Sequence, residues 1–243
     1  MILSYLKLDW SVTLRQKVYL LLSIGLPLAF FLLFTAINDV PKAQQNQVYK
    51  EILFNMTTFS LTSFSLMTFP TELLLDKQNG WQKKLFATPM TPAHYYLAKV
   101  LKMMSLFVIT IVLIFIVGAT VRDIEMPASE WLISGLLLWI GSSLFLSIGL
   151  LIAQSADIKQ AGGIGNLLYI GLAITGGLWF PTDLFPKWLD KLSYYTPTYQ
   201  LKHLGLEFVQ DQTINFTALG FLSGYCILFI ILALAIQKKT DVV

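Results

Sequence analysis

Six stretches of the chain, each at least 19 residues long, contain no Asp, Glu, Lys or Arg: 18–38, 52–71, 103–121, 131–156, 160–182 and 212–237. A helix needs roughly 20 apolar residues to cross a bilayer core about 30 Å thick. Lipid offers no hydrogen-bond partners, so an open chain crosses it only as a helix. The sequence therefore predicts an all-α, polytopic membrane protein with one transmembrane domain over residues 1–243. Its six spans are expected at about 18–37, 52–71, 103–121, 131–154, 163–180 and 213–236.

The composition leaves little room for a soluble domain besides these spans. Charged residues make up 13% of the chain, whereas soluble domains contain roughly 25%. The one cysteine, Cys226, lies inside the sixth run and cannot form a disulfide within the chain. We interpret it as a small apolar side chain that fills space. Any function must therefore reside in the spans, in their connections or in a partner protein.

The distribution of basic residues predicts which side of the membrane each loop faces. If the N-terminus is cytoplasmic, six spans return the C-terminus to the same side. The inner segments then hold eleven of the 17 Lys and Arg residues, and the outer segments hold six. This excess agrees with the positive-inside rule. We therefore expect a multi-pass protein of a bacterial cell membrane with both termini in the cytoplasm.

Residues 1–17 precede the first span and are predicted to form a helix in the cytoplasmic membrane interface. Polar side chains recur there at helical spacing: Ser4, Lys7, Ser11 and Arg15. Trp10 lies on the neighbouring apolar face, as expected for a side chain at headgroup level. An ordered extension of the first span is the alternative. Within that span, Pro27 predicts a kink.

The second span is rich in small polar side chains. Four of them fall on one stripe at helical spacing: Asn55, Thr58, Thr62 and Ser65. Such a stripe can hold helices together through hydrogen bonds or line a polar transport path, and both interpretations stay open. The fifth span contains glycines, among them Gly171 and Gly176, that allow helices to approach closely. We expect these two spans to form a transport path or an interface between two copies.

The longest inner loop, 72–99, contains the short basic segment Trp81–Phe86. Gly80 is predicted to end a helix that extends from the second span, and Thr91-Pro92 to start the next one. The short segment can anchor to the membrane surface or dock onto a cytoplasmic protein. The outer segment 181–211 has two proline-marked starts, which predict half-helices in the outer leaflet.

Several kinds of chemistry are not indicated by the sequence. It lacks the G-x-x-x-x-G-K-[ST] loop that binds ATP, and no Cys/His spacing suggests a metal site. The spans also lack ionisable residues near their midplanes, where proton-coupled transporters keep them. We therefore expect a chain that is not an enzyme and holds no cofactor. Energy for uphill transport would come from an ATPase partner.

Two groups of residues resemble motifs of type-2 ATP-binding-cassette exporter permeases. The first group follows the second span: Glu72, Asp76, Lys77, Gly80, Leu85, Pro89 and Lys99. The second group lies between spans five and six: Phe185, Pro186, Lys187, Trp188 and Leu189, followed by Leu192 and Pro197. The N-terminal helix and the six-span layout match as well, so the resemblance covers essentially the whole chain.

The resemblance implies a half-transporter that pairs with a second permease, expected to be an identical copy, and with ATPase subunits that hold ATP and Mg²⁺. Residues 1–17 would form a connecting helix, and the loop after span two a coupling helix that docks on the ATPase. The docking residues would be Gly80, Trp81, Lys83, Lys84, Leu85 and Phe86, with Glu72 and Pro89 in the same cytoplasmic motif. The family often has Thr after Gly80, where this chain has Trp81. Lipid is the surrounding medium, and no nucleic-acid partner is expected.

The resemblance and the uncharged spans together predict export of an amphipathic or hydrophobic substrate. A drug, a peptide antibiotic or a lipid-like compound fits this description, and resistance to such compounds would be the physiological role. Two alternatives are an ion-coupled secondary transporter and a membrane-bound enzyme or assembly factor without transport activity. The missing midplane charges disfavour the secondary transporter.

The basic asymmetry generates a test of topology. A reporter fused after Val243 should be active only in the cytoplasm, and a cysteine placed at Asn46 should react with an impermeant reagent from outside. An assay of the reporter's activity measures the first outcome, and labelling of intact cells measures the second. If a cysteine placed at Lys83 reacted from outside while the one at Asn46 was protected, the predicted orientation would be wrong.

Overall fold

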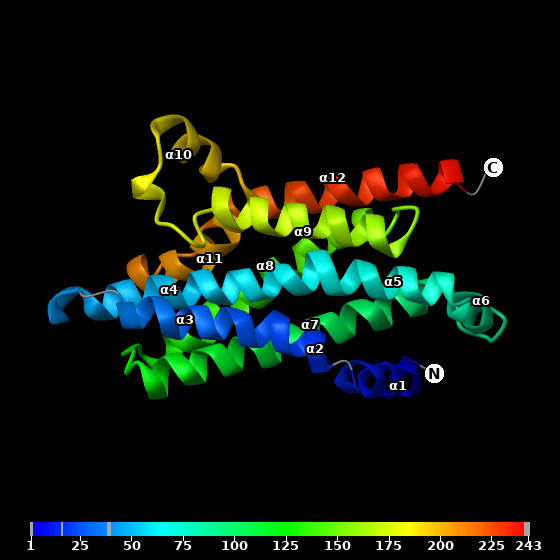
Figure 1. Ribbon diagram of the computed structural model, residues 1–243, viewed down its shortest axis with the longest axis horizontal. Helices are drawn as coiled ribbons and strands as arrows, with labels where there is room; N and C mark the ends of the chain where they lie inside the picture. Colours follow the sequence, from blue (N-terminus) through cyan, green and yellow to red (C-terminus); the bar gives the residue numbers. More distant parts are fainter. Residues whose placement is uncertain (1, 16, 38–39, 241–243) are drawn as a thin grey trace.

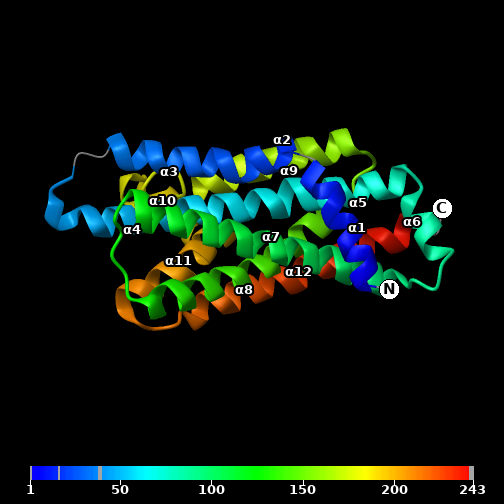
Figure 2. The ribbon, with the colours of Figure 1, turned by 90° about the horizontal axis from the view of Figure 1, so that it is seen from below.

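The computed structural model describes residues 2–15, 17–37 and 40–240, and within these ranges it contains helices and turns but no strand. The long helices run alongside one another and form an elongated bundle (Figure 1). The all-α prediction is confirmed for the described residues. Helix α1 (Ile2–Arg15) lies across α7 at one end of the bundle (Figure 2). The short helix α6 (Trp81–Phe86) and the last turn of α12 lie at the same end.

Two long helical stretches each contain a wider, π-helical turn just before a proline. The first consists of α2 (Lys17–Leu20), the π-helical turn η1 (Leu21–Gly25) and α3 (Leu26–Ile37). The second consists of α4 (Lys42–Ser63), the π-helical turn η2 (Phe64–Thr68) and α5 (Phe69–Gln78). Pro27 and Pro70 each follow two residues after the π turn. Because proline has no N–H for the carbonyl four residues earlier, a wider turn accommodates it. The kink expected at Pro27 stays a prediction, and the π-helical turn before it is a usual site of such bending.

Several helices begin earlier than the apolar runs predicted. Helix α4 starts ten residues before the span expected at 52–71, because residues 42–51 are mostly good helix formers. Helix α7 (Pro92–Val121) starts eleven residues before the span expected at 103–121. There the Thr91 hydroxyl accepts the His94 backbone N–H at 3.3 Å, and Pro92 occupies the first turn. An apolar run marks the part of a helix suited to lipid, and the polar ends continue beyond it.

The second half of the chain adds two long helices and a set of shorter ones. Helix α8 (Ala128–Ile152) leads to α9 (Ile158–Thr175), which Asp157 caps by accepting the Gln160 N–H at 2.7 Å. A 3-10 turn, η3 (Thr182–Leu184), precedes α10 (Lys187–Tyr194) and α11 (Pro197–Asp211). These two short helices begin at the proline signals of the outer segment. Their depth in the membrane stays a prediction. Helix α12 (Phe216–Thr240) ends the described chain.

By length and composition, four helices of the described chain can cross a membrane: Lys42–Gln78, Pro92–Val121, Ala128–Ile152 and Phe216–Ile236. A shorter apolar helix covers Leu21–Ile37. The polytopic character is therefore supported, while the number of six spans stays a prediction. The four helices differ in burial. The apolar stretch of Lys42–Gln78 is 89% buried inside the bundle, whereas that of Phe216–Ile236 is 11% buried. The stretch α4–η2–α5 is thus the central helix of the bundle.

Glycines of two neighbouring helices face the carbonyls of turn η2. A Cβ built on Gly149 of α8 would overlap the carbonyl oxygen of Ser65, and one on Gly165 of α9 would overlap that of Leu66. The close approach is possible only because neither glycine has a side chain. These two contacts seat α8 and α9 against the widened part of the central helix.

The contact at Gly149 can be tested with a single methyl group. Gly149→Ala should lower stability by about 3 kcal/mol, because α8 must move away from the Ser65 carbonyl. The matched control is Gly163→Ala, at a helical position where a Cβ meets nothing within 4 Å. That change should be neutral or slightly stabilising, as Ala favours helices over Gly. Thermal unfolding in detergent measures both, and equal midpoints would contradict the close packing.

Candidate functional site

Two lysines and three carboxylates form a buried cluster at the α6 end of the bundle. The Lys99 Nζ lies 2.9 Å from Asp9 Oδ1, 2.9 Å from Asp76 Oδ2 and 3.7 Å from Glu72 Oε2. The Lys102 Nζ lies 2.9 Å from Asp9 Oδ2 and also contacts Glu72 Oε2. Only 2% of Lys99 and 1% of Lys102 is exposed. We call these five residues the ion cluster.

Helical spacing brings the ion cluster together from three helices. Glu72 and Asp76 are one turn apart at the end of α5, and Lys99 and Lys102 are one turn apart in α7. Asp9 lies on the buried face of α1, one turn from Tyr5 and Thr13, which are also buried. Each helix thus directs its charges toward the same point. The cluster fixes α1 and α5 to the start of α7.

The charges are stable there because each one has a partner. Burying an unpaired carboxylate or ammonium costs several kcal/mol, and pairing offsets that cost only with good geometry. Both lysines contact at least two carboxylates, which meets this condition. Tyr5 borders the cluster with its ring centroid 5.9 Å from the Lys99 Nζ. Burial raises the pKa of the Tyr5 hydroxyl above its ordinary value, although nearby Lys99 opposes the shift.

Helix α6 is connected to the ion cluster through Tyr95. The Phe86 ring packs edge-on against the Tyr95 ring, with centroids 5.9 Å apart. The Tyr95 hydroxyl donates to Asp76 Oδ2 at 2.8 Å, and Lys99 lies 5.8 Å from the same ring. A continuous line of contacts therefore runs from α6 through α7 to α5 and α1. Displacement of α6 would act directly on this line.

The expected docking residues belong to this short helix and to Gly80 directly before it. Gly80 has φ +67°, a conformation that glycine adopts without strain, and it ends α5 as predicted. Lys83, Lys84 and Phe86 are exposed. Trp81 and Leu85 are only partly exposed, and Leu85 packs against the core.

The two motif residues outside α6 have different environments. Pro89 is exposed in the turn between α6 and α7, whereas Glu72 belongs to the ion cluster. Glu72 therefore faces the inside of the bundle, where it pairs with both lysines. The part that this motif plays in docking stays a prediction.

The polar stripe of the second span faces the inside of a single chain. Its four residues are buried, with at most 6% exposure: Asn55, Thr58, Thr62 and Ser65. The Thr62 hydroxyl donates to Thr58 O at 2.8 Å and the Ser65 hydroxyl to Leu61 O at 3.0 Å, both within their own helix. The Asn55 Oδ1 and the Thr58 Oγ1 are buried without a hydrogen-bond partner. The observed surroundings are those of helix packing, and a role in transport stays a prediction.

The two glycines expected at the path lie in different surroundings. A Cβ on Gly176 would overlap the Thr198 hydroxyl of α11, so this glycine permits contact within the chain. Gly171 has no atom within 4 Å of a built Cβ and lies on an open face of α9. The structure therefore does not bring Gly171 together with the polar stripe of α4.

A third buried lysine lies at the opposite end of the bundle. Lys202 of α11 is 1% exposed, and its Nζ lies 3.4 Å from the Gly177 carbonyl and 5.5 Å from the Tyr199 ring centroid. Burial lowers the pKa of Lys202. Burial and the nearby Lys202 charge lower the pKa of His203 to about 3, so this imidazole is neutral and donates to Glu207 at 3.0 Å. This end lacks an equivalent of the ion cluster among the described residues.

Sequence reasoning did not find the ion cluster, although its members were visible. Glu72, Asp76 and Lys99 were recognised only as parts of a family pattern, and Asp9 and Lys102 were not singled out. The usable signal was charged pairs at one-turn spacing on both sides of a loop, Glu72 with Asp76 and Lys99 with Lys102. When the two helices on either side of the loop pack antiparallel, the acidic pair of one can contact the basic pair of the other. If these charges are buried, each needs an opposite charge beside it.

Comparison with known proteins places the chain among membrane transporters. The sequence model of a family described as ABC-2 type transporter matches residues 2–201. The chain is also 31% identical over 231 residues to the "Putative transport permease YvfS" of Bacillus subtilis (strain 168). That alignment covers 95% of this chain and 94% of the relative.

Removal of one lysine tests the ion cluster. In Lys102→Met the three carboxylates keep one buried cation, and breaking a buried ion pair costs about 3–5 kcal/mol. The matched control, Lys77→Met, removes an exposed lysine of α5 and should change stability little. Thermal unfolding in detergent measures both variants.

A second substitution separates charge from packing. Adding Glu72→Gln to Lys102→Met should restore part of the lost stability, because one uncompensated carboxylate is removed. Additive losses in the double variant, or equal unfolding of Lys102→Met and Lys77→Met, would contradict the proposed role of the charges.

Proposed function

Because the chain belongs to the ABC-2 type transporter family, we propose that it is the membrane-spanning subunit of an ATP-driven exporter, with ATP hydrolysed on a separate subunit. The observation that carries this proposal is the connection between α6 and the ion cluster. A short helix that protrudes at one end of the bundle is tied through the Phe86 and Tyr95 rings to charges from three helices. Movement of α6 can thereby reach the transmembrane helices.

Helix α6 is the part of the chain that would dock onto the ATPase. Its exposed charges, Lys83 and Lys84, are both basic. The partly exposed side chains of Trp81 and Leu85 add an apolar surface. Such a surface favours a partner with an apolar groove bordered by acidic residues. ATP and Mg²⁺ would be bound by that partner.

The ion cluster would transmit the movement as a rigid connection. Its contacts hold α1, α5 and α7 against one another, and separating them would expose unpaired charges. The three helices would therefore move together when α6 is displaced. Helix α1 would serve as the connecting helix that the resemblance implies, here through Asp9 on its buried face.

We propose that the protein works as a homodimer in a bacterial cell membrane, with α1, α6 and the end of α12 on the cytoplasmic side. Helix α9 is the better candidate for the contact between copies, since its Gly163 and Gly171 lie on an open face. The polar stripe of α4 is buried within one chain and would reach a substrate only after the helices separate.

The proposed substrate is amphipathic or hydrophobic, such as a drug, a peptide antibiotic or a lipid-like compound. The outward faces of α7, α8 and α12 carry large apolar side chains, among them Leu113, Leu132 and Ile231. A substrate that dissolves in the bilayer can approach these faces without losing hydration. Export would remove such a compound from the inner side of the membrane.

The docking role of α6 can be tested by reversing its charge. Lys83→Glu combined with Lys84→Glu should weaken binding of the ATPase subunit at least about tenfold, because two attractive charges become repulsive. Both lysines are exposed, so the permease itself should fold normally. Co-purification of the ATPase with the tagged permease measures the effect.

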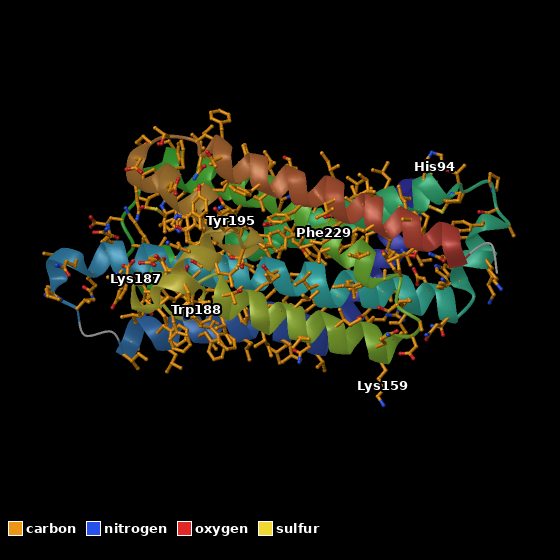
Figure 3. The ribbon with its side chains drawn as sticks, turned by 90° about the horizontal axis from the view of Figure 1, so that it is seen from above. His94, Lys159, Lys187, Trp188, Tyr195 and Phe229 are labelled. Atoms are coloured by element: carbon orange, nitrogen blue, oxygen red, sulfur yellow. The ribbon has the colours of Figure 1, made fainter. Side chains whose placement is uncertain are left out.

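The control reverses a lysine of a different loop at the same end. Lys159 is exposed and lies at the same end of the bundle as His94 (Figure 3). Lys159→Glu should leave the yield of ATPase unchanged. Equal recovery of the ATPase by the double variant and by Lys159→Glu would show that α6 is not the docking element.

A further inference from the structure

Lys202 is a buried cation without a counter-ion in the half of the bundle away from α6. Only 1% of the residue is exposed, and its Nζ donates to the Gly177 carbonyl at 3.4 Å. No carboxylate of the described residues forms an ion pair with it, since Glu51 and Asp183 act on it only at longer range. The two lysines of the ion cluster are as deeply buried, yet each contacts at least two carboxylates. Lys202 therefore lacks the compensation that stabilises the other buried lysines.

The surroundings of Lys202 offset only part of the cost of burying its charge. The last carbonyls of α9 present partial negative charge to it, and the Tyr199 ring centroid lies 5.5 Å from the Nζ. Within the described chain, the remaining N–H groups of the ammonium have no acceptor. A membrane protein that keeps an ionisable side chain in such a position generally uses it for binding or transport. The partner that Lys202 needs is an anion.

Two other buried hydrogen-bond donors come from segments packed around Lys202. The turn after α9 passes through Gly177, which has φ +70°, and leads to Trp179. The Trp179 indole N–H is buried without an acceptor among the described residues, and its ring centroid lies 5.5 Å from that of Phe59 in α4. Thr58, next to Phe59, is fully buried, and its hydroxyl likewise has no partner there. We call Lys202, Trp179 and Thr58 the donor site.

The hydroxyl of Thr58 differs from those of its neighbours in α4. Thr57 and Thr62 donate to carbonyls one turn earlier in the helix, at 2.7 and 2.8 Å. Such a bond satisfies a hydroxyl within its own helix. Thr58 forms no bond of this kind in the described structure. An acceptor for its hydroxyl would therefore come from outside α4.

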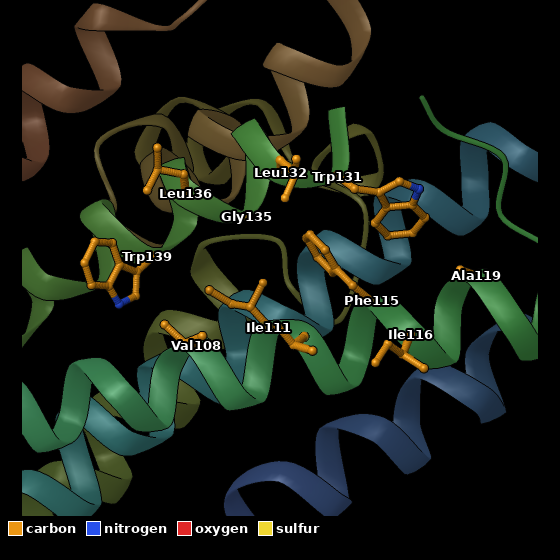
Figure 4. A pocket seen from close by; sticks show the side chains of 11 residues that line it. Val108, Ile111, Phe115, Ile116, Ala119, Trp131, Leu132, Gly135, Leu136 and Trp139 are labelled. Atoms are coloured by element: carbon orange, nitrogen blue, oxygen red, sulfur yellow. The ribbon is translucent and has the colours of Figure 1, made fainter. Parts of the chain in front are cut away.

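The groove between α7 and α8 does not offer this chemistry. Figure 4 shows its apolar lining, which includes Phe115, Trp131 and Trp139. None of the residues that line it is charged. An anion would lose its hydration there without gaining a counter-charge. The donor site supplies both a cation and further hydrogen-bond donors.

We propose that the donor site binds the anionic group, a phosphate or a carboxylate, of an amphipathic substrate. The oxygens of that group accept hydrogen bonds from the Lys202 ammonium, the Trp179 indole and the Thr58 hydroxyl. The site is closed in this structure, so the substrate enters when α4 and α11 separate. This inference rests on the proposed function and narrows its substrate to amphiphiles that carry a negative charge.

Photo-crosslinking tests the proposal on the permease alone. The full chain is reconstituted in phosphatidylcholine vesicles with dodecyl phosphate that carries a diazirine beside the phosphate. Helices separate within microseconds to milliseconds, so minutes of irradiation sample the open site. Mass spectrometry should find the label on the peptides that contain Thr58, Trp179 and Lys202. Dodecyltrimethylammonium with the same diazirine should not label them, because its charge repels that of Lys202.

Removal of the charge separates binding from a structural role. Lys202→Met should reduce labelling by dodecyl phosphate at least about tenfold, because the counter-charge is lost. The same change should raise the unfolding temperature, since a buried charge without a partner is removed. The matched control, Lys191→Met, removes an exposed lysine of α10 and should change neither quantity. Loss of labelling together with a lower unfolding temperature would assign Lys202 a structural role and overturn the proposal.

A second pair of variants covers the case in which Lys202→Met does not fold. Thr58→Val removes a hydroxyl that has no partner among the described residues, so labelling should fall about tenfold without a lower unfolding temperature. The control, Thr57→Val, removes a hydroxyl bonded within α4 and should keep the labelling.

Three results would contradict the proposal. Equal labelling by the two probes would show that charge does not select the ligand. Equal labelling of the wild type, Lys202→Met and Thr58→Val would exclude the donor site. Competition by millimolar inorganic phosphate would identify a site for a small aqueous anion instead of an amphiphile. Since neither ATPase nor ATP is present, such a failure is distinct from a failure of α6 to dock.

Discussion

The ion cluster is the interaction on which the α6 end of the structure depends. Lys99 and Lys102 are themselves buried and hold carboxylates from α1 and α5 close to them. Their attraction is strong there, and so is the cost of separating them. Because α1 contributes only one charge, Asp9, its position on the bundle depends on this single side chain for its ionic contacts. The short helix α6 is connected to the same group of charges through Tyr95.

The rest of the bundle is organised around the central helix α4–η2–α5. Its neighbours approach it through small residues and hydroxyl groups, because lipid does not drive apolar helices together. Gly149 and Gly165 bring α8 and α9 close to turn η2, and Ser63 bonds to Ser23 of η1 at 3.2 Å. The outermost helix, α12, is largely exposed and presents apolar side chains. Polarity thus decreases from the centre of the bundle outward, the reverse of a soluble protein.

Much of the fold could be predicted from charge-free runs and from helix boundary signals. Gly80, Thr91 and Pro197 end or start helices where the sequence indicated. The early starts of α4 and α7 were missed, because hydropathy locates the lipid-facing part of a helix and not its ends. The polar stripe with Thr62 lies in helical backbone, and its role in transport stays a prediction. Its burial within a single chain could not be known, since periodicity does not identify the neighbour. The ion cluster needed contacts between residues 90 positions apart, which no local pattern contains.

The proline turns also determine where the membrane helices can bend. In an α-helical register, Pro27 would leave the Ser23 carbonyl without its donor, and Pro70 would leave that of Leu66. The Ser60 hydroxyl of α4 donates to Ser23 O, and Gly165 of α9 lies against Leu66 O. A neighbouring helix therefore packs against each of these two carbonyls. The stretch α2–η1–α3 contacts α4, and turn η2 contacts α9. Bending at one proline would therefore change the contacts near the other. The two proline turns therefore belong to one series of contacts that runs from η1 through the central helix to α9.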